Sequence, residues 1–298
     1  MSVLTSPAPG IVGDEKTRAV VSEAVDGISQ IATLPEITLK IIALVENPRS
    51  TAQDLHKLIT NDPALVARIL KVVNSAFYGL PGQIGSINRA IVLLGLNAVK
   101  NICIAASLSK LFRGGQIGEK YAAKDLWTHS IAVAVMSRLL VTKTNNTLPD
   151  EGFLAGLMHD IGVVVEWQSL PEQLSNVITA AVVSPMAYTA VETDLLGADH
   201  QTFGQALTAK WKFPRSLQYV TGFHHRPMTL APEVRFLTSI VHVADHVCCQ
   251  MNLGFSLTCN NDPLDSAVLQ DLHITMPEVD QIAAGLPEAM REAEALLS

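Results

Sequence analysis

Residues 59–102, ITNDPALVARILKVVNSAFYGLPGQIGSINRAIVLLGLNAVKNI, contain the clearest fold signal in this chain. Asp62 followed by Pro63 predicts a helix start, because Asp accepts hydrogen bonds from free backbone amides and proline fits the first helical position. An apolar stripe over the next residues supports this helix. The segment from Gly79 to Gly85 predicts a loop, and the apolar residues after it predict two short helices separated at Gly95.

The segments on both sides of this stretch also predict helices. Upstream, Thr51-Ala-Gln-Asp54 resembles a capping box with Asp in place of the usual Glu or Gln, and Leu34–Pro35 separates two earlier helices. Downstream, Gly114–Gly115 and Gly118 mark the boundary between two lobes. Beyond this boundary we expect helices over 125–141, 150–166, 173–183, 186–196, 199–211, 214–225, 233–251 and 277–297. The predicted fold is therefore all-α, with two helical lobes.

Composition and charge exclude several classes of protein. The chain has 298 residues, with 48% hydrophobic and 5% aromatic residues, which is enough for a large aliphatic core. Its net charge of −7 and the lack of a basic stripe argue against a nucleic-acid surface. Polar residues interrupt the longest apolar stretch, from Ile87 to Leu111, so we expect no membrane span. The N-terminus has no signal-peptide pattern, and the cysteines lack metal-finger spacing, so we expect a cytoplasmic protein with reduced thiols.

Seven residues with metal-ligand chemistry follow one another through the second half of the chain: His129, His159, Asp160, His200, His224, His225 and Asp245. The pair His159–Asp160 lies in the apolar run GLMHDIG, where burial is costly unless the two groups bind a metal or pair with each other. Adjacent helical residues diverge by roughly 100°, so we expect the two to serve different ions, with Asp160 as the bridge. This mixture of imidazole and carboxylate suits a divalent metal such as Fe, Mn, Ni, Zn or Mg.

Alternatives to a metal site stay open at this point. A single histidine on an apolar helix, such as His129, His200 or His242, is more often a core residue with a hydrogen-bond partner than a ligand. The whole set could form a polar network without any ion. The absence of an HExxH motif argues against a zinc protease of that class, and the pair Cys248–Cys249 lacks the context of a thiol nucleophile.

Together with the LPEI, GLMHDIG and FHHRP segments, the stretch at 59–102 resembles the HDOD domain, the HD-related output domain of bacterial signalling proteins. The resemblance covers about 30 to 230 and implies an N-terminal HDOD-type lobe packed on a lobe related to HD metal phosphohydrolases. It places the His, His-Asp and distant Asp of the HD pattern on His129, His159, Asp160 and Asp245. It matches the additional histidines of HD-GYP phosphodiesterases to His200, His224 and His225.

The chain also departs from the two families that it resembles in ways that bear on activity. HDOD proteins commonly lack several of these ligands and are then regarded as regulatory, whereas this chain keeps a nearly full set. HD-GYP proteins carry Lys where this chain has Val163, and their GYP signature is replaced here by Arg226-Pro227-Met228. Metal binding is therefore better supported than hydrolysis of a cyclic dinucleotide. If the protein is an enzyme, Asp160 and Arg226 are the catalytic candidates.

These observations lead to one main functional hypothesis and one alternative. We expect a flexible N-terminus at 1–14, an HDOD lobe at 15–115, an HD-like lobe at 120–255 and a C-terminal helical extension at 256–298. The main hypothesis is a stand-alone bacterial signal-transduction module that holds a metal and acts through contacts with a protein partner or in a homodimer. The alternative is a metal-dependent phosphohydrolase acting on a nucleotide or another phosphoester.

Overall fold

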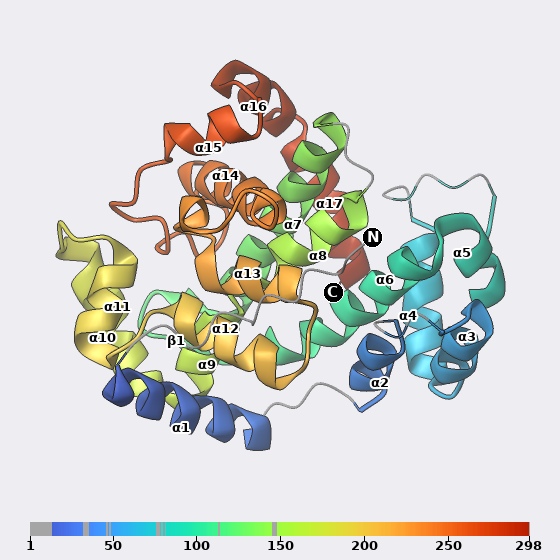
Figure 1. Ribbon diagram of the computed structural model, residues 1–298, viewed down its shortest axis with the longest axis horizontal. Helices are drawn as coiled ribbons and strands as arrows, with labels where there is room; N and C mark the ends of the chain where they lie inside the picture. Colours follow the sequence, from blue (N-terminus) through green and yellow to red (C-terminus); the bar gives the residue numbers. More distant parts are fainter. Residues whose placement is uncertain are drawn as a thin grey trace.

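The computed structural model is an assembly of helices with one short β-hairpin (Figure 1). It describes residues 14–297 except 32–35, 46, 48, 76, 77, 79, 81, 113 and 145–147. The predicted flexible N-terminus, up to residue 13, and the predicted helix break at Leu34–Pro35 lie outside the described residues. The prediction of an all-α fold is confirmed.

The elements fall into four groups along the chain. The helices before the hairpin are α1 (Glu15–Ile31), α2 (Glu36–Val45), α3 (Ala52–Thr60), α4 (Pro63–Val73), α5 (Ile87–Leu94), α6 (Leu96–Leu108) and the 3-10 helix η1 (Ser109–Phe112). The hairpin pairs β1 (Gln116–Ile117) with β2 (Tyr121–Ala122) in antiparallel register. The helices from the hairpin to the site are α7 (Ala123–Lys143), α8 (Pro149–Met158), α9 (Ile161–Ser169), α10 (Pro171–Val183), α11 (Tyr188–Leu196), α12 (His200–Lys210), α13 (Arg215–Phe223), η2 (Pro227–Thr229) and α14 (Phe236–Gln250). The last three are α15 (Ser266–Asp271), α16 (Met276–Ala283) and α17 (Leu286–Leu297).

Local signals predicted from the sequence build the first lobe, which contains α2 to α6. Thr51 and Asp54 form the reciprocal capping box at the start of α3. Asp62 caps α4, and Pro63 is its first residue. Gly95 ends α5 and precedes α6 with a φ of +87°, a conformation that glycine adopts without steric cost. The core of this lobe is aliphatic and includes Ile41, Leu55, Ile59, Leu65, Ile69, Ile87, Ile91 and Ile102.

The cap of α4 gives a prediction for stability. The Asp62 carboxylate accepts the backbone N–H of Leu65 at 3.0 Å, so Asp62→Ala is expected to lower the free energy of unfolding by about 1 kcal/mol. Urea unfolding monitored by circular dichroism measures this loss. Lys71→Ala, an exposed change in the same helix, serves as the control and should stay within about 0.5 kcal/mol of the wild type. Equal stabilities for the two variants would contradict the capping role.

Helix α6 joins the first lobe to the second. All of its side chains from Ala98 to Leu108 are buried. Ile102 and Cys103 belong to the core of the first lobe, whereas Ile104 and Leu108 belong to the core of the second. The two lobes therefore share one helix that is buried on all sides, which is the pattern of a helix enclosed by other helices.

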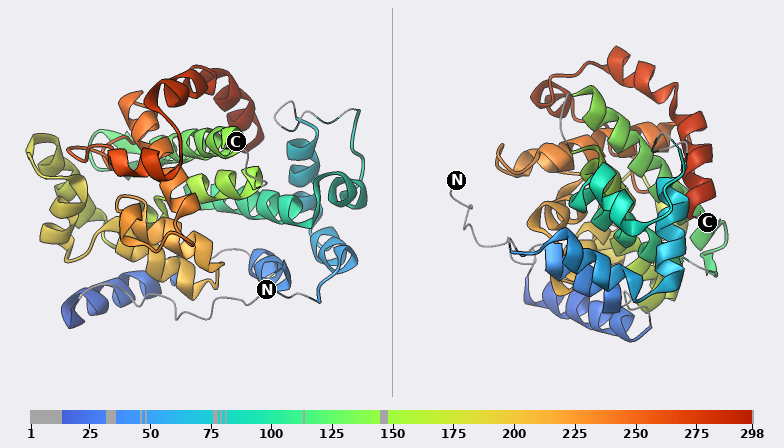
Figure 2. Two further views of the ribbon diagram at one scale, coloured as in Figure 1. Left: turned by 45° about the horizontal axis from the view of Figure 1, so that its top comes forward. Right: turned by 90° about the vertical axis from the view of Figure 1, so that its right-hand side faces the viewer.

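The second lobe is organised around α7. Helices α8 and α14 pack along α7, while α9 and α12 pack against each other and α12 also contacts α13. Helix α1 packs against α9 and α12, apart from α2, as two of the figures show (Figures 1 and 2). Its Val21, Val25 and Ile28 side chains lie in the core of the second lobe. The first lobe predicted at 15–115 included this helix, but its packing joins it to the second lobe.

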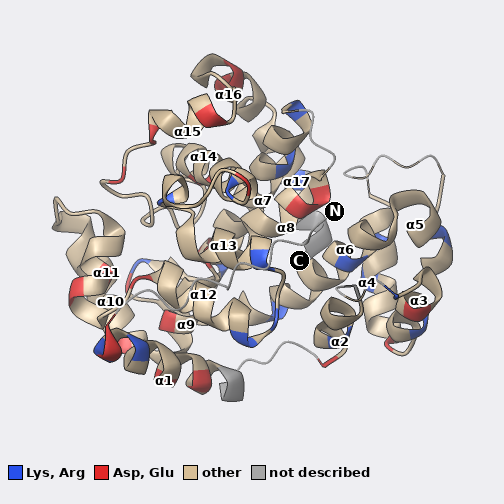
Figure 3. Cartoon of the chain, viewed as in Figure 1, with Lys and Arg blue, Asp and Glu red and all other residues tan. Residues whose placement is uncertain are grey.

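The C-terminal helices pack on the second lobe and also reach the first. Helices α16 and α17 contact α7, and α17 also contacts α4 (Figure 2). Before them, residues 253–262, here called the covering segment, connect α14 to the remaining helices. Lys and Arg lie on helices of both lobes, interspersed with Asp and Glu (Figure 3). Within the described residues, no helix combines the length and the apolar character needed to cross a bilayer.

Candidate metal centre

A break between two helices positions His159 and Asp160. Helix α8 ends at Met158 and α9 begins at Ile161, so the prediction of one continuous helix over 150–166 is wrong. At the break, His159 donates its Nδ1–H to the carbonyl of Gly156 at 2.7 Å. A continuous helix would point adjacent side chains roughly 100° apart. The break instead lets both side chains face one centre.

Close packing of α9 against α12 places His200 beside this pair. A Cβ atom added to Gly162 would lie 1.8 Å from the His200 carbonyl oxygen and 2.9 Å from the Gly204 nitrogen. Real Cβ atoms do not approach backbone that closely, so only glycine allows the two helices to cross at this distance. The crossing therefore sets the position of His200 relative to Asp160.

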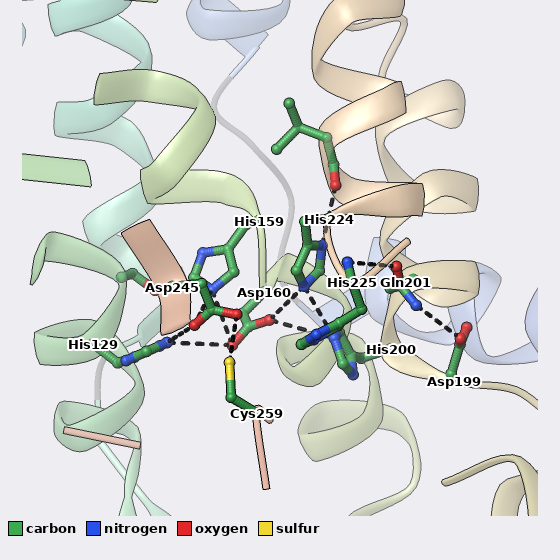
Figure 4. Close-up of polar contacts among 12 residues, drawn as sticks. His129, His159, Asp160, Asp199, His200, Gln201, His224, His225, Asp245 and Cys259 are labelled. Atoms are coloured by element: carbon green, nitrogen blue, oxygen red, sulfur yellow. Dashed lines mark hydrogen bonds and ion pairs between the residues drawn. The ribbon is translucent and has the colours of Figure 1, made fainter. Parts of the chain in front are cut away.

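Asp160 lies between two groups of histidines (Figure 4). Its Oδ2 is 3.3 Å from the Nε2 of His159 and 3.9 Å from the Nε2 of His129. Its Oδ1 is 3.5 Å from the Nε2 of His200 and 3.4 Å from the Nε2 of His224. One carboxylate thus faces imidazoles contributed by four different segments, which is the arrangement expected of a bridging ligand.

The remaining predicted residues complete the two groups. Asp245, on α14, places its Oδ1 3.0 Å from the Nε2 of His129 and 3.7 Å from that of His159. His225, just after α13, joins Asp160, His200 and His224 in a set whose ligand atoms all lie within 4.8 Å of one another. The structure therefore brings together all seven residues singled out from the sequence. Six of them are at most 1% exposed, and the His225 side chain is 4% exposed.

The five histidines share one orientation: each ring holds an oxygen acceptor through Nδ1 and turns Nε2 toward the cluster. The Nδ1 contacts are Leu253 O for His129 (3.0 Å), Gly156 O for His159 (2.7 Å), Glu192 for His200 (2.8 Å), Val220 O for His224 (3.1 Å) and Asp262 for His225 (2.9 Å). Backbone carbonyls only accept, so the first, second and fourth of these rings carry a proton on Nδ1. This outer-shell pattern is typical of histidines that bind a metal through Nε2.

The electrostatics of the centre call for a cation. Burial raises the pKa of Asp160, but His159, His224 and His200 together outweigh burial and hold that pKa well below its ordinary value. Burial likewise opposes ionisation of Asp245, and its hydrogen bond with His129 and the charge of His159 lower its pKa. Burial disfavours a charged His159, yet the two carboxylates raise its pKa well above the ordinary value. Two buried carboxylates thus favour a positive charge between them, which a protonated imidazole or a bound metal ion would supply.

His224 differs from His159 in its charge state. Burial and the neighbouring His225 lower the pKa of His224 to about 3, so this ring is neutral at physiological pH. The Nε2 atoms of His224 and His200 are only 3.2 Å apart. Since the Nδ1 of His224 donates to a carbonyl, its Nε2 carries a lone pair directed at the neighbouring ring. A cation beside both nitrogens would stabilise this arrangement.

Several buried polar atoms at the centre make no hydrogen bond to another described residue, and their chemistry shows whether the residues fit a metal. Within the part of the chain that the structure describes, the Nε2 of His159, the Nε2 of His225 and both oxygens of Asp160 make no hydrogen bond. Buried polar atoms rarely stay without a partner, and each such atom costs stability. Imidazole and carboxylate groups that converge at 3.3–3.9 Å without hydrogen bonds fit a divalent transition metal.

A buried pair of glutamates supports the His200 side of the centre. The carboxyl group of Glu192 contacts both the backbone N–H and the Nδ1 of His200, at 3.1 and 2.8 Å. Glu166 lies nearby, and both glutamates are fully buried. Burial, together with the charge of Glu192, raises the pKa of Glu166; burial and the charge of Asp199 do the same for Glu192. Glu192 therefore holds His200 from outside the cluster.

The covering segment and α14 contribute residues that no pattern in the sequence marked as candidate ligands. The Cys259 thiol lies 3.0 Å from the Oδ2 of Asp245, and Cys249 on α14 lies 3.4 Å from its Oδ1. Asp262 holds the Nδ1 of His225. Burial raises the pKa of the Cys259 thiol. Neither cysteine lies at a ligand spacing along the chain, so no local pattern marked them.

Two other sequence candidates lie beside the cluster. Arg226, a catalytic candidate, pairs with Asp199 at 3.5 Å, and its side chain is 38% exposed. The prediction that it meets a phosphate stays a prediction. His242 donates from Nδ1 to the carbonyl of His224 at 2.7 Å and so supports the turn after α13. Burial and the neighbouring His246 lower the pKa of His242 to about 4.

Comparison with known protein families gives one clear match. The model of the HDOD domain family matches residues 31–227 of this chain. An uncharacterised protein of Treponema pallidum (strain Nichols) is 26% identical over 231 residues, which is 77% of this chain and 44% of that protein. The chain thus spans less than half the length of this relative.

Solved structures share the fold at lower sequence identity. One is a protein of Shewanella amazonensis SB2B that was provisionally named a phosphohydrolase. Its TM-score to this chain is 0.72, with 23% identity over 94% of this chain and 98% of that protein's chain. Another is a protein of Marinobacter aquaeolei VT8 that was provisionally named a signal transduction protein. Its TM-score is 0.75, with 20% identity over 98% of this chain and 68% of that protein's chain. At these identities the likeness concerns the fold alone.

Proposed function

The chain belongs to the HDOD domain family, and on this premise we propose that it is a regulatory signalling module that holds a divalent transition metal. The metal is bound by His129, His159, Asp160 and Asp245, with His200, His224 and His225 on the other side of Asp160. Output passes through contacts with other proteins. A bound ion would supply Lewis acidity and electrostatic stabilisation to groups at the centre.

One observation carries this proposal: buried donor atoms converge on a common centre without hydrogen-bond partners. The Nε2 of His159 and both oxygens of Asp160 are of this kind. The neighbouring histidines are held from behind through Nδ1, which leaves Nε2 for the ion. A polar network serving only stability would be expected to join these atoms by hydrogen bonds. Here Asp160 lies 3.3–3.9 Å from the Nε2 atoms of His159 and His129 without a hydrogen bond.

Burial favours a regulatory role over hydrolysis. The ligand side chains are almost fully buried, and the covering segment lies against them through the contact of Cys259 with Asp245. A phosphoester would need an open path to the metal. HD-GYP enzymes carry Lys where this chain has Val163, and Arg226 is paired with Asp199. Few cationic side chains are therefore left to receive a phosphate.

The position of Asp160 between two sets of donors favours the phosphohydrolase alternative. Asp160 faces histidines on both of its oxygens, and two adjoining sets of donors share it. Two metals bridged by one carboxylate are common in enzymes that displace groups at phosphorus. In this alternative Asp160 holds the ions, and movement of the covering segment opens the centre to substrate.

Measuring the metal content of protein purified without a histidine tag tests the proposal. We expect about one or more transition-metal ions per chain in the wild type and a loss of most of this metal in His159→Ala. His56→Ala, which removes a histidine of the first lobe, is the control and should keep the wild-type content. Less than about one metal per two chains in the wild type, unchanged in His159→Ala, would overturn the proposal.

A substrate screen then separates the two functions. The metal-loaded protein is incubated with nucleotides, cyclic dinucleotides and a chromogenic phosphoester. We expect no turnover above that of the metal-free protein. Turnover that disappears in Asp160→Asn would replace the regulatory function with the phosphohydrolase alternative.

A further inference from the structure

The covering segment is anchored on several sides of the metal centre. The Leu253 carbonyl accepts the Nδ1–H of His129 at 3.0 Å, and the Phe255 N–H donates to the carbonyl of Asp125 at 3.0 Å. Farther along, the Asn260 side chain donates to the carbonyl of Ala181 at 3.0 Å. These contacts fix the segment between α7 and α10, so the position of Cys259 within it is defined.

Cys259 lies among donors of the centre. Its Sγ is 3.0 Å from the Oδ2 of Asp245, whereas His129 contacts the Oδ1 of the same carboxylate (Figure 4). Ligand atoms of His225, Asp245 and Cys259 all lie within 4.8 Å of one another. Cysteine, histidine and aspartate in such a set form a donor group typical of Zn²⁺.

His225 gives an independent sign of a ligand at this position. Its side chain is 4% exposed, and its Nε2 makes no hydrogen bond within the described part of the chain. Its Nδ1 is held at 2.9 Å by Asp262, so the ring cannot turn to find another partner without losing this contact. A carboxylate behind a histidine is the common support of a metal-binding imidazole. Cys259 and Asp262 thus bring a donor and a supporting carboxylate from the same segment.

Cys249 is a weaker candidate than Cys259. Its thiol lies 3.4 Å from the Oδ1 of Asp245, in a set with His129. That oxygen and the Nε2 of His129 already contact each other at 3.0 Å. The set around Cys259 instead contains the unpaired Nε2 of His225.

We propose that Cys259 is a metal ligand and that His225, Asp245 and Cys259 form a mixed nitrogen, oxygen and sulfur position at the edge of the centre. This inference rests on the proposed metal-binding function. A thiolate ligand selects Zn²⁺, Fe²⁺ or Co²⁺ over Mg²⁺, because soft sulfur binds the harder ion poorly. The covering segment then serves as part of the metal site as well as its cover.

Cobalt substitution tests the role of Cys259 without relying on activity. Untagged protein is stripped with a chelator, reconstituted with Co²⁺ under reducing conditions and examined by absorption spectroscopy. We expect a thiolate-to-cobalt charge-transfer band in the wild type and in Cys103→Ser, a cysteine of the first lobe. Cys259→Ser should lose the band while Co²⁺ still binds at the histidines, and its affinity for Zn²⁺ should fall by about tenfold or more.

The outcomes separate this inference from the proposed function. Co²⁺ binding without a charge-transfer band in the wild type would overturn the role of Cys259 and leave the metal-binding function in place. A band that persists in Cys259→Ser and disappears in Cys249→Ser would also overturn it. Absence of Co²⁺ binding in the wild type would overturn both proposals. Circular dichroism measures whether Cys259→Ser is folded. Cys259→Asp serves as a second variant, which keeps an anionic donor but lacks sulfur.

Discussion

Gly162→Ala is expected to lower the free energy of unfolding by about 3 kcal/mol or more and to abolish metal binding. The added Cβ would lie 1.8 Å from the His200 carbonyl oxygen and 2.7 Å from its carbonyl carbon. Backbone atoms cannot move aside as the end of a flexible side chain can. Helices α9 and α12 must therefore separate, which takes His200 away from Asp160. Thermal and urea unfolding of metal-stripped protein measure the first effect, and metal content measures the second.

Gly85→Ala is the matched control for this substitution. Gly85 is exposed, and an added Cβ would meet no atom within 4 Å. Its stability should stay within about 0.5 kcal/mol of the wild type, with metal content unchanged. A Gly162→Ala protein that is as stable as Gly85→Ala and keeps its metal would show that the crossing of α9 and α12 tolerates a side chain.

Removal of the metal is expected to lower the Tm of the wild type by roughly 8–16 °C. A ligand present at about a thousand times its Kd stabilises the folded state by about 4 kcal/mol, and each kcal/mol shifts the Tm of a chain of this size by roughly 2–4 °C. In Asp160→Asn the shift should nearly vanish. The amide keeps the shape of the carboxylate but removes the negative charge that faces both groups of histidines. Differential scanning calorimetry with metal and with chelator measures the difference.

Asp194→Asn tests whether the loss is specific to the centre. Asp194 is an exposed carboxylate on α11, and its amide variant should show the same chelator-induced fall in Tm as the wild type. If the wild type itself shows no such fall, the metal contributes nothing to folding. If Asp160→Asn shows the full fall, the bridging role assigned to Asp160 is wrong.

Features that depend on a few neighbouring residues were predictable from the sequence. The capping box of Thr51 and Asp54, the start of α4 at Asp62–Pro63 and the break at Gly95 all appear where the sequence placed them. Each depends on contacts within about one helical turn, which the order of residues specifies directly. The identity of the histidines and aspartates was also visible, because such groups are costly to bury without a partner.

The break between α8 and α9 could not be predicted in this way. GLMHDIG is apolar on both sides of His159–Asp160 and contains no proline, so its local pattern favours one helix. The chain breaks where it lets both polar side chains face the same centre. The reason lies in groups distant in sequence: Asp160 faces His200 and His224, while His159 faces Asp245.

The order of residues was enough to predict an all-α chain, most helix boundaries and the seven residues of the candidate centre. How those residues meet depends on tertiary packing, since the contact of His129 with Asp245 joins positions 116 apart in sequence. That packing also joined α1 to the second lobe and brought Cys259 and Asp262 to the centre. Helix periodicity and caps report neighbours within one or two turns, whereas these contacts depend on the path of the whole backbone. The packing of Gly162 against His200, which sets that path at the centre, leaves no local pattern in the sequence.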